Sequence, residues 1–579
     1  MVHPHAAPVS VAAERPSVLY YGDNLLILRN RDYFPSESVD LVYLDPPFNS
    51  NQDYNVLFAE QDGSRSAAQI RAFTDTWRWD AEARRQYDEM TTGAMTRAGQ
   101  ALLSLHDFIG ESDMLAYLSM MAPRLIELRR VLRNTGCIYL HCDSNASHYL
   151  KILMDGVFGP AMFRNEIIWK RKTGRGETNH EARRFGVSTD TLLFYSKTDD
   201  YLFKSQFSFD ADGYDEYIDK FYRHTDDQGR RFRIADLSSP SPRPNLTYEY
   251  KGYKPPKNGW AISREKMEQW DREGRLHFPK SPDGRIQRRR FLDELKGKPI
   301  QNLWDDIDPI SSQSDERLGF PTQKPEALLE RVLQASSEEG DTVLDPFCGC
   351  GTTISAAQRL RRRWIGIDIT HLAITLIRSR LADAFPTGLN YRVVGEPADL
   401  QGAETLAKSD RYQFQWWALG MIGARPVQEE RKKGADSGID GKLFFREKEN
   451  GPVKLMVIQV KSGALKLSEV RDFAHVIERE KAQVGVLLTL AEPTREMKIE
   501  AGGLGFYKPE YRLDPEADTK YERYQILTIR ELFEGKRPQY PPFRNVTFKA
   551  APPAKVLPKG PKARTKKLSE QLSDATTGE

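Results

Sequence analysis

The hydrophobic pattern of this chain consists of short apolar runs that stop at prolines, glycines or acidic residues. Residues 39–44 form one such run, whose length and composition predict a buried strand. Pro46 and Pro47 follow closely and end the strand, because proline cannot donate a hydrogen bond to a neighbouring strand. Runs at 136–143 and 190–197 predict further strands of the same sheet, which indicates an α/β fold class.

A second pattern is a strand, a glycine-containing turn and a helix in succession. Residues 342–345 predict the strand, and Gly349 and Gly351 permit a tight turn and the close approach of a ligand. A helix through 354–357 follows, and the next strand ends at Asp368, about 20 positions after the turn, where an acidic residue can bind ribose hydroxyls. The spacing matches neither G-x-G-x-x-G nor G-x-x-x-x-G-K-[ST], which disfavours NAD and nucleoside triphosphates. A generic βαβ turn is the alternative.

The residues that end the first strand have a specific chemistry. Open α/β sheets bind their ligands at the carboxyl ends of strands, and this end carries Asp45, Pro46, Pro47 and Phe48. Asp45 and the Pro46 carbonyl can accept both hydrogens of an amine, and Phe48 can stack on a base that has left a duplex. Neither a metal nor a covalent nucleophile is needed. The alternative is a Pro-Pro turn with an ordinary surface aspartate.

Together the two motifs resemble those of the DNA amino-methyltransferases, the N6-adenine and N4-cytosine enzymes. The strand-end motif precedes the glycine turn, as in the permuted β-class, and residues 321–329 look like the family's helix that closes over the cofactor. The resemblance covers about residues 18–400. It implies a Rossmann-like sheet, S-adenosylmethionine as the cofactor and double-stranded DNA as the substrate. In the family, the base is held by residues matching Asp45, Pro46, Pro47 and Phe48, and the cofactor is lined by those matching Asp345, Phe347, Gly349, Gly351, Thr352, Asp368 and Thr322.

The first residue of the strand-end motif bears on the target base. Family members that begin this motif with Asp mostly modify adenine, and those that begin with Ser mostly modify cytosine. Asp45 therefore favours N6-adenine. Because the correlation is imperfect, N4-cytosine stays as an alternative.

Basic and aromatic residues alternate in the segment between the predicted strand at 190–197 and Thr322. Residues 242–257 and the arginines Arg288, Arg289 and Arg290 are typical of phosphate and base contact. The resemblance places a target recognition region here, at about 200–305. Lys170 and Arg171 begin a basic stretch that we expect to be a flexible loop over the DNA. A solvated charged surface is the alternative for both segments.

A second domain is indicated by residues 401–550. An aromatic helix at 412–419 precedes Asp440, and a predicted strand at 454–462 places Gln459 and Lys461 on one face. This stretch resembles the Mrr-like branch of the PD-(D/E)xK restriction endonucleases, which implies a smaller α/β endonuclease-like domain. Asp440 can hold Mg²⁺, and Lys461 can orient water or stabilise charge on the phosphorus. Since Gln459 is a weaker magnesium ligand than a carboxylate, a domain that only binds DNA is the alternative.

Composition adds few constraints. The chain has 579 residues, a mean hydropathy of −0.61 and a net charge of +3, so attraction to DNA must come from local patches. We expect no signal peptide and no membrane span, and we interpret the four cysteines as reduced packing residues rather than a zinc site. Residues 1–17 and the basic tail 551–579 are predicted to be disordered. The expected setting is the prokaryotic cytoplasm, in a restriction-modification or defence system, and a homodimer is compatible with the β-class resemblance.

Overall fold

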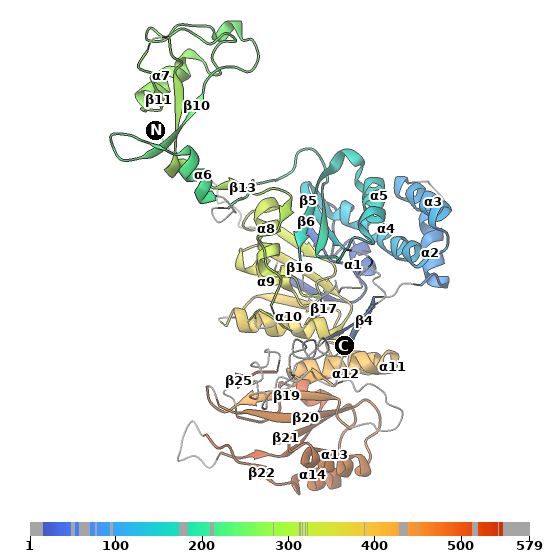
Figure 1. The fold of residues 1–579 in the computed structure, drawn as a ribbon. Coiled ribbons are helices and arrows are strands. Elements are labelled where there is room, and N and C mark those ends of the chain that lie inside the picture. The colour runs from blue at the N-terminus through green and yellow to red at the C-terminus, as the bar shows by residue number, and fades with distance from the viewer. Residues whose placement is uncertain are drawn as a thin grey trace, which may run out of the picture. The chain divides into compact units, whose positions relative to one another are not determined.

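The computed structural model places most of the chain in two compact units, one of which is residues 204–306 (Figure 1). The residues described here are 16–47, 52–56, 70–75, 78–92, 96–172, 183, 185–208, 214–281, 283–311, 314, 316–318, 320, 322–386, 388–427, 438–449, 451–511, 519–541 and 544–547. Residues 1–15 and 551–579 of the predicted disordered termini and Phe48 lie outside these residues, whereas Ser17 begins the strand β1 and so differs from the prediction.

A mixed sheet forms the centre of the first unit. From β6 to β17 its strand order is β6-β7-β5-β2-β15-β16-β1-β17. The strands from β5 to β17 are parallel, whereas β7 runs antiparallel to both β5 and β6. The bounds are β1 Ser17–Tyr21, β2 Val39–Leu44, β5 Leu132–Cys142, β6 Phe163–Lys170, β7 Thr189–Ser196, β15 Thr342–Asp345, β16 Arg363–Asp368 and β17 Tyr391–Val394.

Helices cover both faces of this sheet. Figure 1 shows α8, α9 and α10 gathered on one side and α4 and α5 on the other. Every residue of β2 is buried, as expected for a strand between two layers of helices. The bounds are α1 Asn24–Arg29, α2 Ala81–Thr91, α3 Arg97–Ile109, α4 Asp113–Val131, α5 Ser147–Phe158, α8 Glu326–Ser336, α9 Thr352–Arg359 and α10 His371–Ala384.

Residues 204–306 form the second unit around a small core that contains Trp260, Met267 and Leu276. Its sheet has the order β11-β12-β10-β9, and β10 and β12 are antiparallel. The bounds are α6 Tyr214–Phe221, β9 His224–Thr225, β10 Arg231–Asp236, α7 Arg264–Arg272, β11 Leu276–His277 and β12 Gln287–Phe291.

The C-terminal part of the chain has its own sheet, with the order β18-β19-β20-β21-β24. β19 and β20 are antiparallel, whereas β20, β21 and β24 are parallel, and an apolar cluster covers each face. This is the α/β arrangement predicted for the second domain. The bounds are α11 Leu400–Ser409, α12 Arg411–Met421, β18 Arg425–Pro426, β19 Gly441–Arg446, β20 Val453–Lys461, α13 Leu467–Arg479, β21 Val484–Thr489, α14 Arg495–Gly502, β24 Tyr524–Thr528 and α15 Ile529–Phe533.

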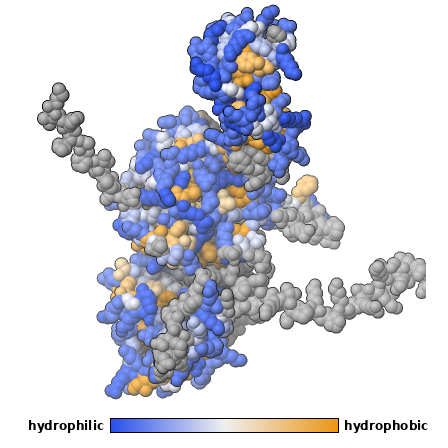
Figure 2. All heavy atoms as spheres, turned by 90° about the vertical axis from the view of Figure 1, so that its left-hand side faces the viewer, coloured by the Kyte–Doolittle hydropathy of each residue, from blue (hydrophilic) through white to orange (hydrophobic). Residues whose placement is uncertain are grey.

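The four cysteines are buried and free, as expected for packing residues. The face of the molecule in Figure 2 is mostly hydrophilic, with apolar side chains in small patches. Across the described ranges, none of the helices combines the length and apolar character needed to cross a membrane.

Gly366 in β16 tests the packing between the sheet and α9. A Cβ atom at this position would lie 2.4 Å from Ile354 Cδ1 and 3.1 Å from Leu19 Cδ1. We expect Gly366→Ala to lower the free energy of unfolding by about 1–3 kcal/mol, since the surrounding core has no room for the methyl group. Chemical denaturation of the full chain measures this loss. Ile354→Val removes the nearest atom, so the double variant should lose less than Gly366→Ala; an equal or larger loss would contradict the packing argument.

Candidate functional site

A cavity of about 300 Å³ opens at the edge of the central sheet where the parallel strands have their carboxyl ends. Its volume lies at the lower end of the range for small-molecule sites. Its lining includes the end of β2, the turn between β15 and α9, the segment that precedes α8, the residues that follow β1 and β16, and parts of α4 and α8. The lining residues that the sequence had singled out are Asp45, Pro47, Thr322, Asp345, Phe347, Gly349, Thr352 and Asp368.

The glycine turn after β15 has the conformation that the sequence predicted. Gly349 and Gly351 have φ angles of +47° and +76°, which favour glycine. A Cβ atom at Gly351 would also lie 2.6 Å from Ile377 Cγ1, so a larger residue is excluded there by packing as well. The turn therefore brings backbone close to the cavity, although Gly351 itself is not among the lining residues.

Asp345 is a buried carboxylate and Asp368 a partly buried one, and they lie at the ends of neighbouring strands. Asp368 accepts hydrogen bonds from the Gly349 N–H at 2.9 Å and from the N–H and hydroxyl of Thr370, both at 2.9 Å. Burial raises the pKa of Asp368 to about 6 and that of Asp345 to about 7. Both carboxyl groups thus gain or lose a proton near neutral pH.

Asp45 lies directly after β2, and one of its oxygens is held by a lysine from a distant part of the chain. Lys324 Nζ is 2.5 Å from Asp45 Oδ2, and the side chains of both residues are largely buried. The other oxygen, Oδ1, is buried and has no hydrogen-bond partner in the described structure. A buried acceptor without a donor is costly, so this oxygen is suited to a donor from a ligand.

A buried hydrogen-bonded chain leads away from the Asp45 end of β2. The Tyr43 hydroxyl lies 2.9 Å from His141 Nδ1, and His141 Nε2 lies 3.1 Å from Asp190 Oδ2. Because a carboxylate can only accept, Nε2 carries a proton and donates to Asp190. Burial alone raises the pKa of Asp190, but its contacts with His141 and the charges of Lys324 and Arg171 lower it overall. This chain holds Tyr43, and with it the strand end, in place.

The basic stretch at 170–175 differs from our expectation of a flexible loop. Lys170 is the last residue of β6, and the Arg171 guanidinium Nε lies 3.0 Å from Asp190 Oδ1. A buried carboxylate therefore fixes Arg171 beside the sheet. Residues 173–175 lie outside the described part of the chain.

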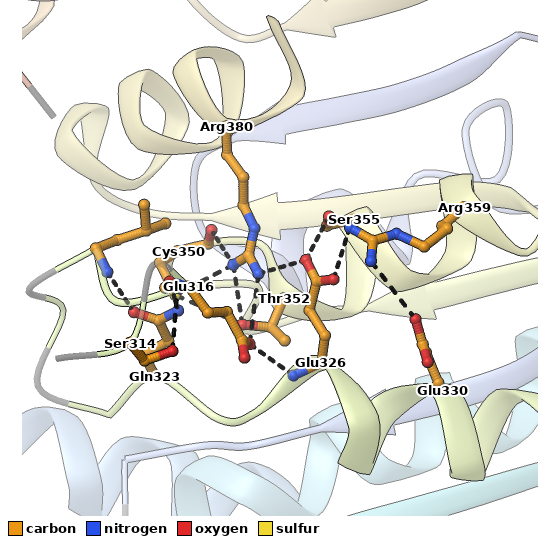
Figure 3. Close-up of polar contacts among 11 residues, drawn as sticks. Ser314, Glu316, Gln323, Glu326, Glu330, Cys350, Thr352, Ser355, Arg359 and Arg380 are labelled. Atoms are coloured by element: carbon orange, nitrogen blue, oxygen red, sulfur yellow. Dashed lines mark hydrogen bonds and ion pairs between the residues drawn. The ribbon is translucent and has the colours of Figure 1, made fainter. Parts of the chain in front are cut away.

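A polar network joins two walls of the cavity (Figure 3). Arg380 of α10 donates to Glu326 Oε1 at 2.8 Å and to the Thr352 hydroxyl at 3.1 Å. Glu316 in turn accepts from the Glu326 N–H at 2.6 Å. The first residue of α8, the start of α9 and the segment before α8 are thus connected through one guanidinium.

Three consecutive arginines lie on β12 in the unit formed by residues 204–306. The Arg288 guanidinium lies 4.2 Å from the centre of the Trp270 ring, and that of Arg289 lies 5.0 Å from the centre of the Phe232 ring. Arg290 is exposed. Stacking on aromatic rings holds two of these cations in defined positions.

The endonuclease-like residues come together at the end of the C-terminal sheet. Asp440 Oδ1 accepts from Gln415 Nε2 of α12 at 2.8 Å, and its Oδ2 accepts from the Val460 N–H at 2.7 Å. Gln459 donates through Nε2 to the Gly438 carbonyl at 3.2 Å, whereas its Oε1 is buried without a partner among the described residues. Lys461 lies 3.0 Å from Glu469. No cluster of three His, Cys, Asp or Glu suited to a metal occurs in the described ranges.

Sequence reasoning missed four residues that shape these sites. Lys324 belongs to the Thr-Gln-Lys-Pro motif, but no role followed from the motif alone, because its partner Asp45 is 279 residues away. His141, Arg380 and Gln415 are placed by strand and helix packing. In the sequence, His141 could have been noticed as a polar residue inside an otherwise apolar run. Nothing in the sequence around Arg380 pointed to its role.

Two family models match this chain. The family model described as DNA methylase matches residues 39–379, and the one described as restriction endonuclease matches residues 407–505. A type II methyltransferase, M.EcaI of Enterobacter cloacae, is 30% identical over 63% of this chain and 70% of its own length. The Mod subunit of the type III restriction-modification enzyme StyLTI of Salmonella typhimurium is 28% identical over 58% of this chain and 49% of its own length.

Solved structures were compared as well. A putative DNA modification methylase from Thermus thermophilus is 17% identical with a TM-score of 0.32, covering 66% of this chain and all of the other. The PvuII DNA methyltransferase, described as cytosine-N4-specific, is 14% identical with a TM-score of 0.30, covering 66% and 98%. From the match over residues 39–379, the chain belongs to the DNA methylase family, and its C-terminal part carries a restriction endonuclease domain of the Mrr type.

Proposed function

We propose that this DNA methylase transfers a methyl group from S-adenosylmethionine to the N6 amine of adenine in double-stranded DNA. The observation that carries the proposal is the position of Asp45. Its carboxylate lies at the rigid end of β2 and lines the same cavity as the glycine turn and Asp368. An amine acceptor and a nucleoside site thus share one pocket.

The residues around the cavity fit S-adenosylmethionine. Asp368 is suited to accept the ribose hydroxyls, the Gly349 turn lets the ligand approach the backbone, and Phe347 and Thr322 add contact surface. The bound cofactor would supply an electrophilic methyl group. The fit rests on the cavity and on the chemistry of these donors and acceptors.

The amine would be held by Asp45 Oδ1 and by the carbonyl of Pro46. Lys324 binds Oδ2, which leaves the buried Oδ1 for a donor from the substrate. Two acceptors on one nitrogen draw its lone pair out of the conjugated ring and aim it at the methyl group. Pro46 and Pro47 fix both acceptors, because proline restricts the backbone.

The choice of adenine rests on the strand-end motif. It begins with Asp45, and family members that begin this motif with Asp mostly modify adenine; N4-cytosine is the alternative. Mass spectrometry of nucleosides from DNA treated with the protein and S-adenosylmethionine separates the two products.

We assign the methyltransferase to about residues 18–400 and target recognition to about 200–305 within it. The arginines of β12 support DNA contact there, since two of them are held by aromatic rings and Arg290 is exposed. Substituting Arg290 is expected to lower the affinity for DNA, by a factor that shrinks as the salt concentration rises.

Asp45→Ala tests the methyltransferase directly. Methyl transfer should fall by about 10²–10³-fold, because the substituted side chain accepts no hydrogen bond from the amine. Incorporation of labelled methyl groups into DNA measures this rate. The Kd of S-adenosylmethionine, from calorimetry, should stay within about threefold of the wild-type value. Full activity in Asp45→Ala would refute the assignment.

The pH dependence of cofactor binding tests Asp368. Its pKa of about 6 is above the ordinary aspartate value, so the carboxyl group gains a proton as the pH falls through 6. The neutral group is a poorer acceptor for ribose hydroxyls, and the Kd of S-adenosylmethionine should therefore rise below pH 6. Calorimetry between pH 5 and 8 measures it. Asp368→Asn should bind S-adenosylmethionine more weakly, and its Kd should lack the rise below pH 6. Any change of Kd that comes from the protonation of Asp345 remains in both proteins. If the Kd of the variant has the same pH dependence as that of the wild type, the assignment is contradicted.

We propose Mg²⁺-dependent cleavage of DNA as a second activity, within about residues 401–550. The supporting observation is that Gln459 Oε1 is buried without a donor close to Asp440. These two oxygen donors suit a hard cation, and Mg²⁺ would supply charge for phosphodiester hydrolysis when bound. Lys461 would orient the water, after leaving Glu469, and Gln415 would have to release Asp440 Oδ1.

Lys461→Ala tests the endonuclease. Nicking of supercoiled plasmid with Mg²⁺ should fall by at least about 100-fold, since a charged group near the phosphate is lost. Lys454→Ala removes another lysine of β20, paired with Glu510, and should nick at the wild-type rate. If wild-type protein nicks neither methylated nor unmethylated DNA, the domain serves only to bind DNA.

A further inference from the structure

Arg380 is a buried cation with partners in two segments that line the cofactor pocket, and it lies outside the pocket's own lining. Besides Glu326 Oε1 and the Thr352 hydroxyl, it reaches the Cys350 carbonyl at 3.4 Å. Figure 3 shows the guanidinium between the glycine turn and the carboxylates of Glu316 and Glu326. Its contacts therefore link segments that are far apart in the sequence.

Those segments are the two walls of the pocket. Cys350 and Thr352 line the pocket from the glycine turn and the start of α9. Phe320, Gln323 and Lys324 line it from the segment before α8. Because Arg380 binds the first wall directly and the second through Glu326, its geometry affects the distance between them.

The carboxylates around Arg380 require a cation. Burial raises the pKa of Glu316, and the nearby charge of Glu326 raises it further. Burial also acts to raise the pKa of Glu326, but contacts with Ser355 and Arg380 lower it overall. Glu316 Oε1 lies 3.9 Å from the Arg380 guanidinium. Without Arg380, the half-exposed Arg359 would be the cation left beside Glu326, and the repulsion between Glu316 and Glu326 would increase.

Hydrogen bonds connect Glu316 to Gln323, which lines the pocket. Gln323 donates through Nε2 to the Glu316 carbonyl at 2.6 Å and accepts from the Leu318 N–H at 2.8 Å. Lys324 follows Gln323 and holds Asp45. The wall before α8 is thus connected at one end to Arg380 and at the other to the amine-binding carboxylate.

We propose that Arg380 is a positioning residue that holds the two walls of the pocket at the separation needed for S-adenosylmethionine. The proposal rests on the methyltransferase function proposed above. Arg380 touches neither cofactor nor DNA; it acts through Thr352 and Cys350 on one wall and through Glu326 and Glu316 on the other. It therefore affects cofactor binding more than the rate of methyl transfer from the bound cofactor.

The test compares two conservative lysine substitutions. Arg380→Lys keeps the charge but has one nitrogen, which cannot reach both walls as a planar guanidinium does. We expect its KM for S-adenosylmethionine to rise by at least about tenfold, with kcat within about threefold. Arg359→Lys is the matched control. Arg359 lies 2.8 Å from the other oxygen of Glu326, but its side chain is 53% exposed, so both constants should match wild type.

A double variant separates positioning from simple neutralisation of charge. Arg380→Met with Glu326→Gln removes both charges of this buried pair, so neither is left without its partner, which favours a folded protein. If Arg380 positions the walls, the KM stays raised by about tenfold in this variant. If Arg380 only neutralises Glu326, the KM returns to the wild-type value and the proposal is overturned. Thermal unfolding of each variant checks that it is folded.

The results also distinguish this proposal from the function on which it rests. If the wild-type protein does not bind S-adenosylmethionine in calorimetry, the proposed function fails. If the wild-type protein binds it and Arg380→Lys has the same KM as Arg359→Lys, the function stands and the positioning proposal is wrong. A fall in kcat at unchanged KM in Arg380→Lys overturns it as well.

Discussion

Parallel strands bring their carboxyl ends to one edge of a sheet, and in this sheet those ends carry buried carboxylates. Asp45, Asp345 and Asp368 follow or end three adjacent strands, β2, β15 and β16. Removing charge from water is expensive unless donors or cations compensate. The raised pKa values of Asp345 and Asp368 show that the compensation there is incomplete. Many of the neighbouring donors and cations bind these three carboxylates.

Each carboxylate is compensated in a different way. Asp368 is held by the Gly349 N–H of the glycine turn and by the N–H and hydroxyl of Thr370, and it is accordingly available to a neutral ligand such as a nucleoside. Asp45 is held by the cation of Lys324, which covers one oxygen and leaves the other free for a donor. Asp190, farther along the same edge, is held by His141 and Arg171. The kind of partner thus determines which ligand chemistry each position can support.

The sequence predicted the elements better than the contacts between them. The strand at 39–44, the glycine turn and the strand that ends at Asp368 follow from local composition, since proline, glycine and apolar runs act over a few residues. The expected loop at Lys170 and Arg171 was wrong for these residues, because the strand β6 extends to Lys170 and Asp190 binds Arg171. A basic stretch has the same composition whether its side chains face solvent or a buried carboxylate. Here the pairing of β6 with β7 places Arg171 beside Asp190, and the local sequence does not reveal this pairing.

Helix α12 shows why the C-terminal domain cannot be considered apart from the methyltransferase. Gln415 of this helix donates to Asp440, the proposed metal ligand. The next residue, Trp416, packs against the apolar cluster of Phe320, Cys350, Leu372 and Leu376, two of which line the cofactor cavity. Successive residues on a helix point in directions about 100° apart, so one short helix can contact both regions. Helix α12 therefore contacts residues that line the cofactor pocket and also donates to Asp440, so one short helix links the two sites.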